Sequence, residues 1–113
     1  MKQESTTPAP LPVEIAAARF AALGSEQRLE VLRVLVRAGE DGLAIGVLGQ
    51  RVGITGSTLT HHMKILVAAG LARQHKQGRS VICAAVEYDD LAALSAYLLS
   101  ECCADCAPEP GDE

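Results

Sequence analysis

Three of the four cysteines in this 113-residue chain lie near its C-terminus, in the stretch ECCADC at residues 101–106. We call Cys102, Cys103 and Cys106 the cysteine cluster. If a helix extends through this stretch, Cys106 lies on the turn next to the other two thiols, which are themselves about 100° apart around the axis. Three thiolates can then converge on one small centre. Such a centre suits a soft metal or metalloid, and the same thiols suit redox exchange.

The fourth cysteine, Cys83, stands alone in the sequence. It alternates with Val81 and Ala85 on one face of an expected β-strand, so its simplest interpretation is a small buried apolar residue. The cysteine cluster has no comparable packing role, because it lies among acidic residues near the end of the chain. The sequence therefore predicts that the cluster binds a metal or metalloid or undergoes thiol redox chemistry, with Cys83 as the alternate third ligand.

A second distinctive region is the stretch from residue 43 to residue 86, which contains five basic residues and no acidic one. The chain as a whole carries a net charge of −4, because all 14 of its Asp and Glu residues lie outside this stretch. A basic block in an acidic chain is typical of a surface that binds a polyanion. Nucleic acid is therefore the expected partner, although acid depletion by chance is the alternative that composition alone leaves open.

The periodicity of the apolar residues predicts the elements that carry these groups. The expected helices span residues 13–23, 26–38, 44–52, 56–69 and 90 to about 103. Ser25 is expected to cap the second helix and Asp89 the last. Before the last helix, LARQHK and RSVICAAV predict a two-stranded hairpin with its turn at Gln77 and Gly78. The fold class is therefore mainly α with a β-hairpin, that is, α+β.

The chain is long enough for one domain with one modest core. We expect that domain at residues 13–106, between disordered tails at residues 1–12, which contain three prolines, and at residues 107–113, which are acidic. Only three aromatic residues are present, so the core must be built from aliphatic side chains. Oligomerisation is a natural source of additional buried area for such a core.

Two short helices joined by a tight turn at Gly53 and followed by a hairpin are typical of a winged helix-turn-helix, whose second helix enters the major groove of DNA. Leu59, Met63 and Leu66 are expected to face the core. His62 lies between the two faces and is expected to be a buried, hydrogen-bonded structural residue. The predicted DNA contacts are Ser57, Thr58, Thr60, His61 and Lys64 on this helix, and Lys76 and Arg79 at the hairpin tip.

Three stretches, LGSEQRLEVLRVL, STLTHHMKILVAAGLA and KQGRSVICAAV, resemble the ArsR/SmtB family of dimeric winged-helix repressors. The resemblance covers residues 16–99, most of the chain. It implies a homodimer built on the first and last helices, binding to an inverted repeat in operator DNA, and release when an inducer binds. By position, Ser57, Thr60 and His61 match the residues with which the family reads bases.

The resemblance also implies which inducer to expect. Many arsenic sensors of the family carry a cysteine pair at the start of the first helix of the helix-turn-helix, but the matching stretch, LAIGVLG, has no cysteine. The family's zinc sensors use Asp and His of the last helix, which here contains no His. Some arsenical-responsive members carry a cysteine pair near the C-terminus, with a third cysteine either in the wing, like Cys83, or soon after the pair, like Cys106.

The expected inducer is therefore trivalent arsenic, as arsenite or methylarsenite. Arsenite takes three sulfur ligands, whereas methylarsenite has one carbon substituent and needs only two. The alternatives are a redox-responsive or sulfane-sulfur-responsive repressor of the same fold, and a sensor of another soft metal. A small thiol enzyme is a further alternative, which the lack of an acid–base pair or a phosphate-binding glycine loop disfavours. We therefore expect no enzymatic activity.

The expected compartment is the cytoplasm, where thiols stay reduced. The longest uninterrupted apolar stretch, ILVAAGLA, is far shorter than the roughly 20 residues that a spanning helix needs, so no contact with the membrane interior is expected. The N-terminal residues also lack the apolar core of a secretory signal.

Overall fold

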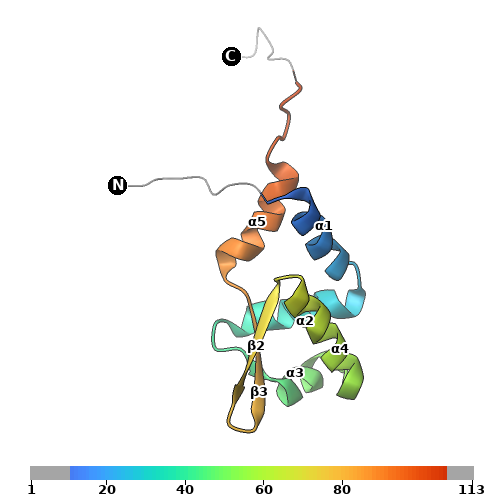
Figure 1. Cartoon of the computed structure of the whole chain (residues 1–113), viewed down its shortest axis with the longest axis vertical. Coiled ribbons are helices and arrows are strands. Elements are labelled where there is room, and N and C mark those ends of the chain that lie inside the picture. Colours follow the sequence, from blue (N-terminus) through green and yellow to red (C-terminus); the bar gives the residue numbers. More distant parts are fainter. Residues whose placement is uncertain (1–10, 107–113) are drawn as a thin grey trace, which may run out of the picture.

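The computed structural model describes residues 11–106, which form five helices and a three-stranded antiparallel sheet (Figure 1). The elements follow one another as α1 (Val13–Ala22), α2 (Glu26–Ala38), β1 (Leu43–Ala44), α3 (Ile45–Val52), α4 (Gly56–Ala68), β2 (Ala72–Gln77), β3 (Ser80–Ala85) and α5 (Tyr88–Leu99). The predicted mainly α fold with a β-hairpin is thereby confirmed. Residues 1–10 and 107–113 lie outside the described part of the chain, and so do the predictions made for them.

The two residues before α1 belong to the fold, although the sequence assigned them to the tail. Leu11 packs against the hydrophobic core. Pro12 occupies the N-cap position of α1, and its carbonyl oxygen accepts a hydrogen bond from the backbone N–H of Ala16 at 3.0 Å. A proline suits this position because the first N–H groups of a helix have no partner within the helix.

The sheet contains one strand that the sequence did not predict. Its order is β1-β3-β2, and β1 pairs Leu43 with Cys83 and Ala44 with Ile82. The expected helix start at Ala44 is accordingly wrong by one residue, because α3 begins at Ile45. A strand of two residues is too short to show a period of its own, so it exists only because β3 offers it a free edge.

The elements divide into two regions that Figure 1 separates clearly. The helix–hairpin region consists of α2, α3, α4 and the sheet, and the hairpin tip lies at its far end. The α1–α5 region contains the first and last helices, which lie side by side and contact each other. The connection between α1 and α2 lies beside α4, so the chain passes from one region to the other next to this helix.

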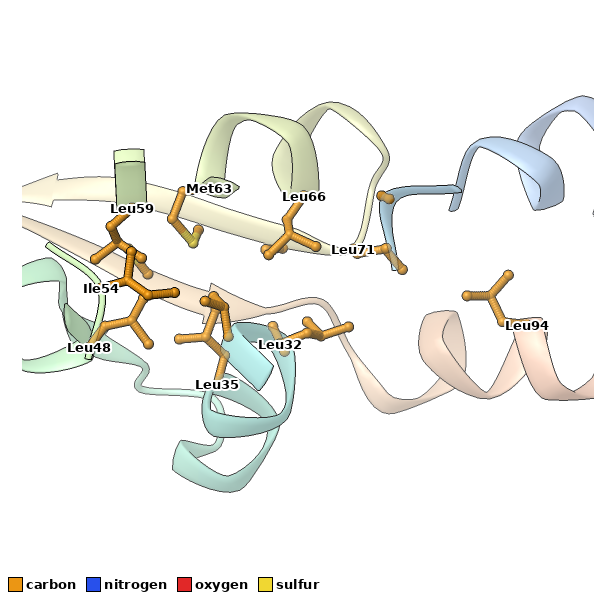
Figure 2. Close-up of a cluster of buried hydrophobic side chains, with 14 residues drawn as sticks. Leu32, Leu35, Leu48, Ile54, Leu59, Met63, Leu66, Leu71 and Leu94 are labelled. Atoms are coloured by element: carbon orange, nitrogen blue, oxygen red, sulfur yellow. The ribbon is translucent and has the colours of Figure 1, made fainter. Parts of the chain in front are cut away.

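The core lies mainly in the helix–hairpin region (Figure 2). Leu59, Met63 and Leu66 of α4 point into it with exposed fractions of 3%, 0% and 0%, which confirms the predicted stripe. They meet Leu35 of α2 and Leu48 of α3, which are also fully buried. Each such side chain contributes roughly 1.5–3 kcal/mol through its removal from water, so α4 is held in place chiefly by this stripe.

The last helix has different ends from those predicted. It begins at Tyr88 with Glu87 at the N-cap, so Asp89 is not the cap and lies in the first turn, where its charge suits the helix dipole. It ends at Leu99 rather than at about residue 103. Its last turn has no basic side chain, and the hydroxyl of Ser100 donates to the carbonyl oxygen of Tyr97 at 3.1 Å. Such side-chain bonds compete with helix propagation, which accounts for the early end.

Candidate DNA-binding surface and cysteine site

The turn between α3 and α4 is tight because two glycines allow it. Gly53 ends α3 with a φ of 72°, the left-handed conformation that the sequence predicted for this residue. Gly49 is buried in α3, and a Cβ atom on it would lie 2.7 Å from the carbonyl oxygen of Ile54 and 3.3 Å from Leu59. The two helices can approach this closely only because Gly49 has no side chain. The angle and spacing of the helix pair are thereby fixed.

The outer face of α4 carries every residue of this helix that the sequence assigned to DNA contact. These residues are all exposed: Ser57, Thr58, Thr60, His61 and Lys64. The hydroxyl of Thr60 donates to the carbonyl oxygen of Gly56 at 3.3 Å, which leaves its lone pairs free to accept. The structure thus confirms that these side chains share the exposed face of the helix, while their contacts to DNA stay a prediction.

The hairpin tip carries two further exposed basic residues, Lys76 and Arg79, on either side of Gly78 with its φ of 64°. Arg73 differs from them, since its guanidinium donates to the carbonyl oxygens of Ala85 at 2.7 Å and Glu40 at 3.3 Å. Arg73 is therefore a structural residue that holds the base of the hairpin. Of the five basic residues between 43 and 86, the other four are exposed.

His62 points away from the exposed face of α4 and is buried, with an exposed fraction of 7%. Its Nε2 lies 2.9 Å from Oε1 of Gln27, and its Nδ1 lies 3.4 Å from Nη1 of Arg28. A neutral ring protonated at Nε2 satisfies both contacts, because it donates to the amide oxygen and accepts from the guanidinium. Burial, then Arg28 and then His61 hold the pKa of His62 below its ordinary value of 6.5. The predicted structural role is confirmed.

Two members of the cysteine cluster lie together in the structure. The Sγ atoms of Cys102 and Cys103 are 3.7 Å apart, and both side chains are exposed. They lie in a succession of turns after α5, in which Cys103 has a φ of 62° and its carbonyl oxygen accepts from the N–H of Cys106 at 3.0 Å. The helical spacing that was expected to align Cys106 with the pair is therefore not realised, because α5 ends at Leu99.

Cys83 lies elsewhere, in the middle strand of the sheet. Its side chain is fully buried, and its Sγ is 3.7 Å from Oε1 of Gln74 on the neighbouring strand. Burial raises the pKa of this thiol, which keeps it protonated and unreactive. Across residues 11–106, no three His, Cys, Asp or Glu side chains are grouped in a way that could hold a metal ion. Among the four cysteines, all of which lie within residues 11–106, the structure brings the Sγ atoms of Cys102 and Cys103 together.

Comparison with known proteins agrees with the arrangement of the two helices and the hairpin described above. A family model described as a helix-turn-helix domain matches residues 23–75. An ArsR-like transcriptional regulator from Rhodococcus sp. RHA1 has a similar structure, with a TM-score of 0.67 and 27% identity over 82% of this chain and 83% of that chain. The chain is a winged helix-turn-helix protein with the fold of ArsR-family transcriptional regulators.

Two other matches support the same assignment. The homodimeric winged helix-turn-helix domain of Mb0332 from Mycobacterium bovis has a TM-score of 0.63 and 22% identity, and the match covers 82% of this chain and 81% of that one. The uncharacterised HTH-type transcriptional regulator YceK of Bacillus subtilis is 36% identical over 67 residues, which are 59% of this chain and 66% of YceK, just under two thirds. These names are those of regulators rather than enzymes, as predicted.

This winged helix-turn-helix protein has an apolar surface on its first and last helices. Val13 and Ile15 on α1 are 60% and 42% exposed, and Leu98 and Leu99 on α5 are 67% and 65% exposed. Exposed apolar side chains gathered on two adjacent helices are typical of a surface that another protein covers. By contrast, no helix in residues 11–106 combines the length and apolar character needed to cross a bilayer.

Gln27 and Arg28 are the residues near the DNA-binding surface that sequence reasoning missed. Both lie in the first turn of α2, and both contact the ring of His62 on α4. The predicted burial of His62 could have pointed to them, because a buried histidine requires polar partners on a neighbouring element. The sequence does not say which of the many polar residues on the neighbouring helices provides them, since that depends on how the helices pack.

Proposed function

We propose that this chain is a transcriptional repressor of the ArsR type, which binds operator DNA as a homodimer and is released by trivalent arsenic. The observation that carries the DNA-binding part is the exposed, acid-free face formed by α4 and the hairpin tip, on a fold shared with transcriptional regulators. A cytoplasmic location, in which the thiols stay reduced, belongs to the same proposal.

In the proposed complex, α4 lies in the major groove. Ser57, Thr60 and His61 present short donors and acceptors and a ring to the base edges, and Lys64 contacts phosphate. Lys76 and Arg79 at the hairpin tip bind the neighbouring phosphates or minor groove. Because these cations replace counterions on the DNA, affinity for the operator falls steeply as the salt concentration rises.

The proposed dimer uses the exposed apolar side chains of α1 and α5. A two-fold axis through these helices gives two copies of α4, which fits an inverted repeat whose half-sites are about one helical turn of DNA apart. The small aliphatic core supports the same conclusion, because burying this surface adds stability that one chain alone lacks.

The proposed inducer site is centred on Cys102 and Cys103, whose sulfur atoms are already close together and exposed. Each thiol loses its proton and displaces one hydroxyl from arsenic as water. Two such bonds are enough for methylarsenite. Arsenite requires a third sulfur, for which Cys106 is exposed and near in the sequence, whereas Cys83 would first have to leave its buried position.

Release from DNA follows by linkage between the two sites. The cysteine pair comes directly after the exposed Leu98 and Leu99, which belong to the proposed dimer surface. Arsenic bound there reorganises the turns after α5 and shifts the arrangement of the two subunits, and thus of the two α4 helices. If the bound form disfavours the spacing that the operator needs, arsenic and DNA weaken each other's binding by the same factor.

The test is operator binding, measured by fluorescence anisotropy with and without arsenite or phenylarsenite. We expect the wild type to be released by both compounds and the Cys102→Ser/Cys103→Ser variant to stay bound at every concentration. The matched control is Cys83→Ser, which should respond to phenylarsenite as the wild type does. Release of the double variant by either arsenical would contradict the proposed site.

A thiol switch is the second candidate function, and the 3.7 Å separation of the two exposed thiols favours it. An oxidant or a sulfane-sulfur donor would convert the pair, or one member of it and Cys106, into a disulfide or polysulfide bridge. Adjacent cysteines form a disulfide only with strain, so the partner in a bridge would be Cys106 or Cys83, of which Cys106 is the exposed one. Mass spectrometry after treatment with peroxide or polysulfide decides this, since a switch requires a reversible mass change that parallels loss of DNA binding.

A further inference from the structure

Two arginines connect the α1–α5 region to α4. The first is Arg19 on α1, whose Nε donates to the carbonyl oxygen of Ala69, the C-cap residue of α4, at 3.0 Å. Its guanidinium lies against Gly70, where a Cβ atom would come within 2.9 Å of Nη2. The absence of a side chain at Gly70 therefore leaves room for Arg19 to reach the end of α4.

The second is Arg28 on α2, whose guanidinium contacts two helices at once. Its Nε donates to the carbonyl oxygen of Ala22, the last residue of α1, at 2.6 Å. Its Nη1 lies 3.4 Å from Nδ1 of His62, in the middle of α4. The backbone N–H of Arg28 donates to Oγ of Ser25 at 3.2 Å, so the arginine starts from a fixed position in the first turn of α2.

Together with the 2.9 Å hydrogen bond between His62 and Gln27, these contacts differ in kind from the apolar packing around α4. Leu59, Met63 and Leu66 are buried in the core, but apolar contact has no preferred direction. Hydrogen bonds depend on distance and angle, so they resist rotation or sliding of the helix on its apolar face. The hydrogen bonds at His62 and at Ala69 lie about two helical turns apart. Two such fixed points oppose both the rotation and the sliding of α4.

We propose that Arg28, together with Arg19, is a positioning residue that fixes the orientation of α4 relative to the end of α1. The inference rests on the proposed function, in which α1 belongs to the dimer surface and α4 reads DNA. A displacement of α1 then moves α4 through these two guanidinium groups. This makes them a physical connection between the state of the dimer and the register of the DNA-reading face.

The experiment compares Arg28→Gln with the matched control Arg33→Gln, which changes an exposed arginine on the same helix. The probes are an operator duplex that the wild type selects from a random library and an unrelated duplex of the same length. We expect Arg28→Gln to lose at least tenfold in affinity for the operator, with its affinity for the unrelated duplex and its salt dependence unchanged. Arg33→Gln should bind both duplexes as the wild type does.

The ratio of operator to unrelated affinity is the decisive readout, because partial unfolding lowers both affinities together and leaves their ratio unchanged. If Arg28→Gln does not fold, as judged by circular dichroism, Arg19→Gln takes its place with the same expectation. A wild-type ratio in a folded variant overturns the positioning role while the proposed function stands. If the wild type selects no duplex at all, the proposed function fails, and this inference fails with it.

Discussion

Helix α4 and the cysteine segment at residues 101–106 differ in how firmly the rest of the fold holds them. α4 has three buried apolar side chains and is hydrogen-bonded to two arginines, Arg19 and Arg28, and its outer face is exposed. The cysteine segment has no buried side chain, and its backbone follows successive turns. Under the proposed function this difference is useful, because a helix that reads DNA keeps one geometry whereas an inducer-binding segment changes its own.

The largest difference between these regions should appear in thiol reactivity. Under native conditions, the three exposed cysteines should react with a thiol reagent at once, while Cys83 should react only when the sheet opens. Opening costs up to the full free energy of unfolding, about 5–15 kcal/mol, so the slow phase should lag by several orders of magnitude. Stopped-flow labelling measures both phases, and a Cys83→Ser variant should lack the slow one. Four equally fast thiols would contradict the burial of Cys83.

Truncation of a core residue under α4 should lower the free energy of unfolding far more than a substitution in the cysteine segment. Leu66→Ala should lower the free energy of unfolding by about 2–5 kcal/mol, because it leaves a cavity beneath α4. Cys106→Ser should change it by less than about 0.5 kcal/mol, since that side chain is exposed. Urea denaturation measures both values. A similar loss in the two variants would mean that the cysteine segment packs on the fold more closely than its exposure indicates.

Removal of one charge should change the salt dependence of DNA binding at the hairpin tip but not in the cysteine segment. Lys76→Ala should weaken binding to all duplexes to a similar degree and reduce the salt slope by about 1, as expected for one lost phosphate contact. Glu101→Ala, a charge change of the same size in the cysteine segment, should leave the slope unchanged. Affinity titrations from low to high salt give the slopes. Effects of similar size and opposite sign in the two variants would show that long-range charge, rather than a local contact, is responsible.

The smallest effect concerns the pH dependence of stability through His62. Its pKa in the folded chain lies below the ordinary value of 6.5, so the unfolded chain binds the proton first as the pH falls. The contribution of His62 to stability is therefore complete above about pH 6.5 and is lost progressively between that value and the lower pKa of the folded chain. Chemical denaturation at several pH values should show this loss in the wild type. In His62→Gln the loss over this window should be smaller.

Much of the helix–hairpin region could be predicted because its signals are local. The spacing of Leu59, Met63 and Leu66 identified the buried face of α4, and with it the exposed face. Gly53 and Gly78 marked the two turns, because each occupies a conformation that other residues rarely adopt. His62 was correctly predicted to be buried from its place between the two faces alone.

The remaining features depend on contacts between residues far apart in the sequence. β1 forms only because Leu43 and Ala44 pair with β3, about 40 residues later. The end of α5 was placed too late because Leu98, Leu99 and the cysteines show no breaker such as Gly or Pro. The alignment of Cys106 with the other two thiols was inferred from that longer helix, so it was lost with it. Arsenical sensing itself stays a prediction, with arsenite and methylarsenite as open alternatives.

The early end of α5 at Leu99 has a consequence for the use of this fold as a scaffold. Since no side chain of residues 101–106 is buried, another short ligand-binding sequence can replace them without creating a cavity or displacing a core residue. If residues 101–106 bind the inducer as proposed, they can be exchanged while the helix–hairpin region stays unchanged. A set of biosensors with different inducers and one common operator could be built by replacing residues 101–106.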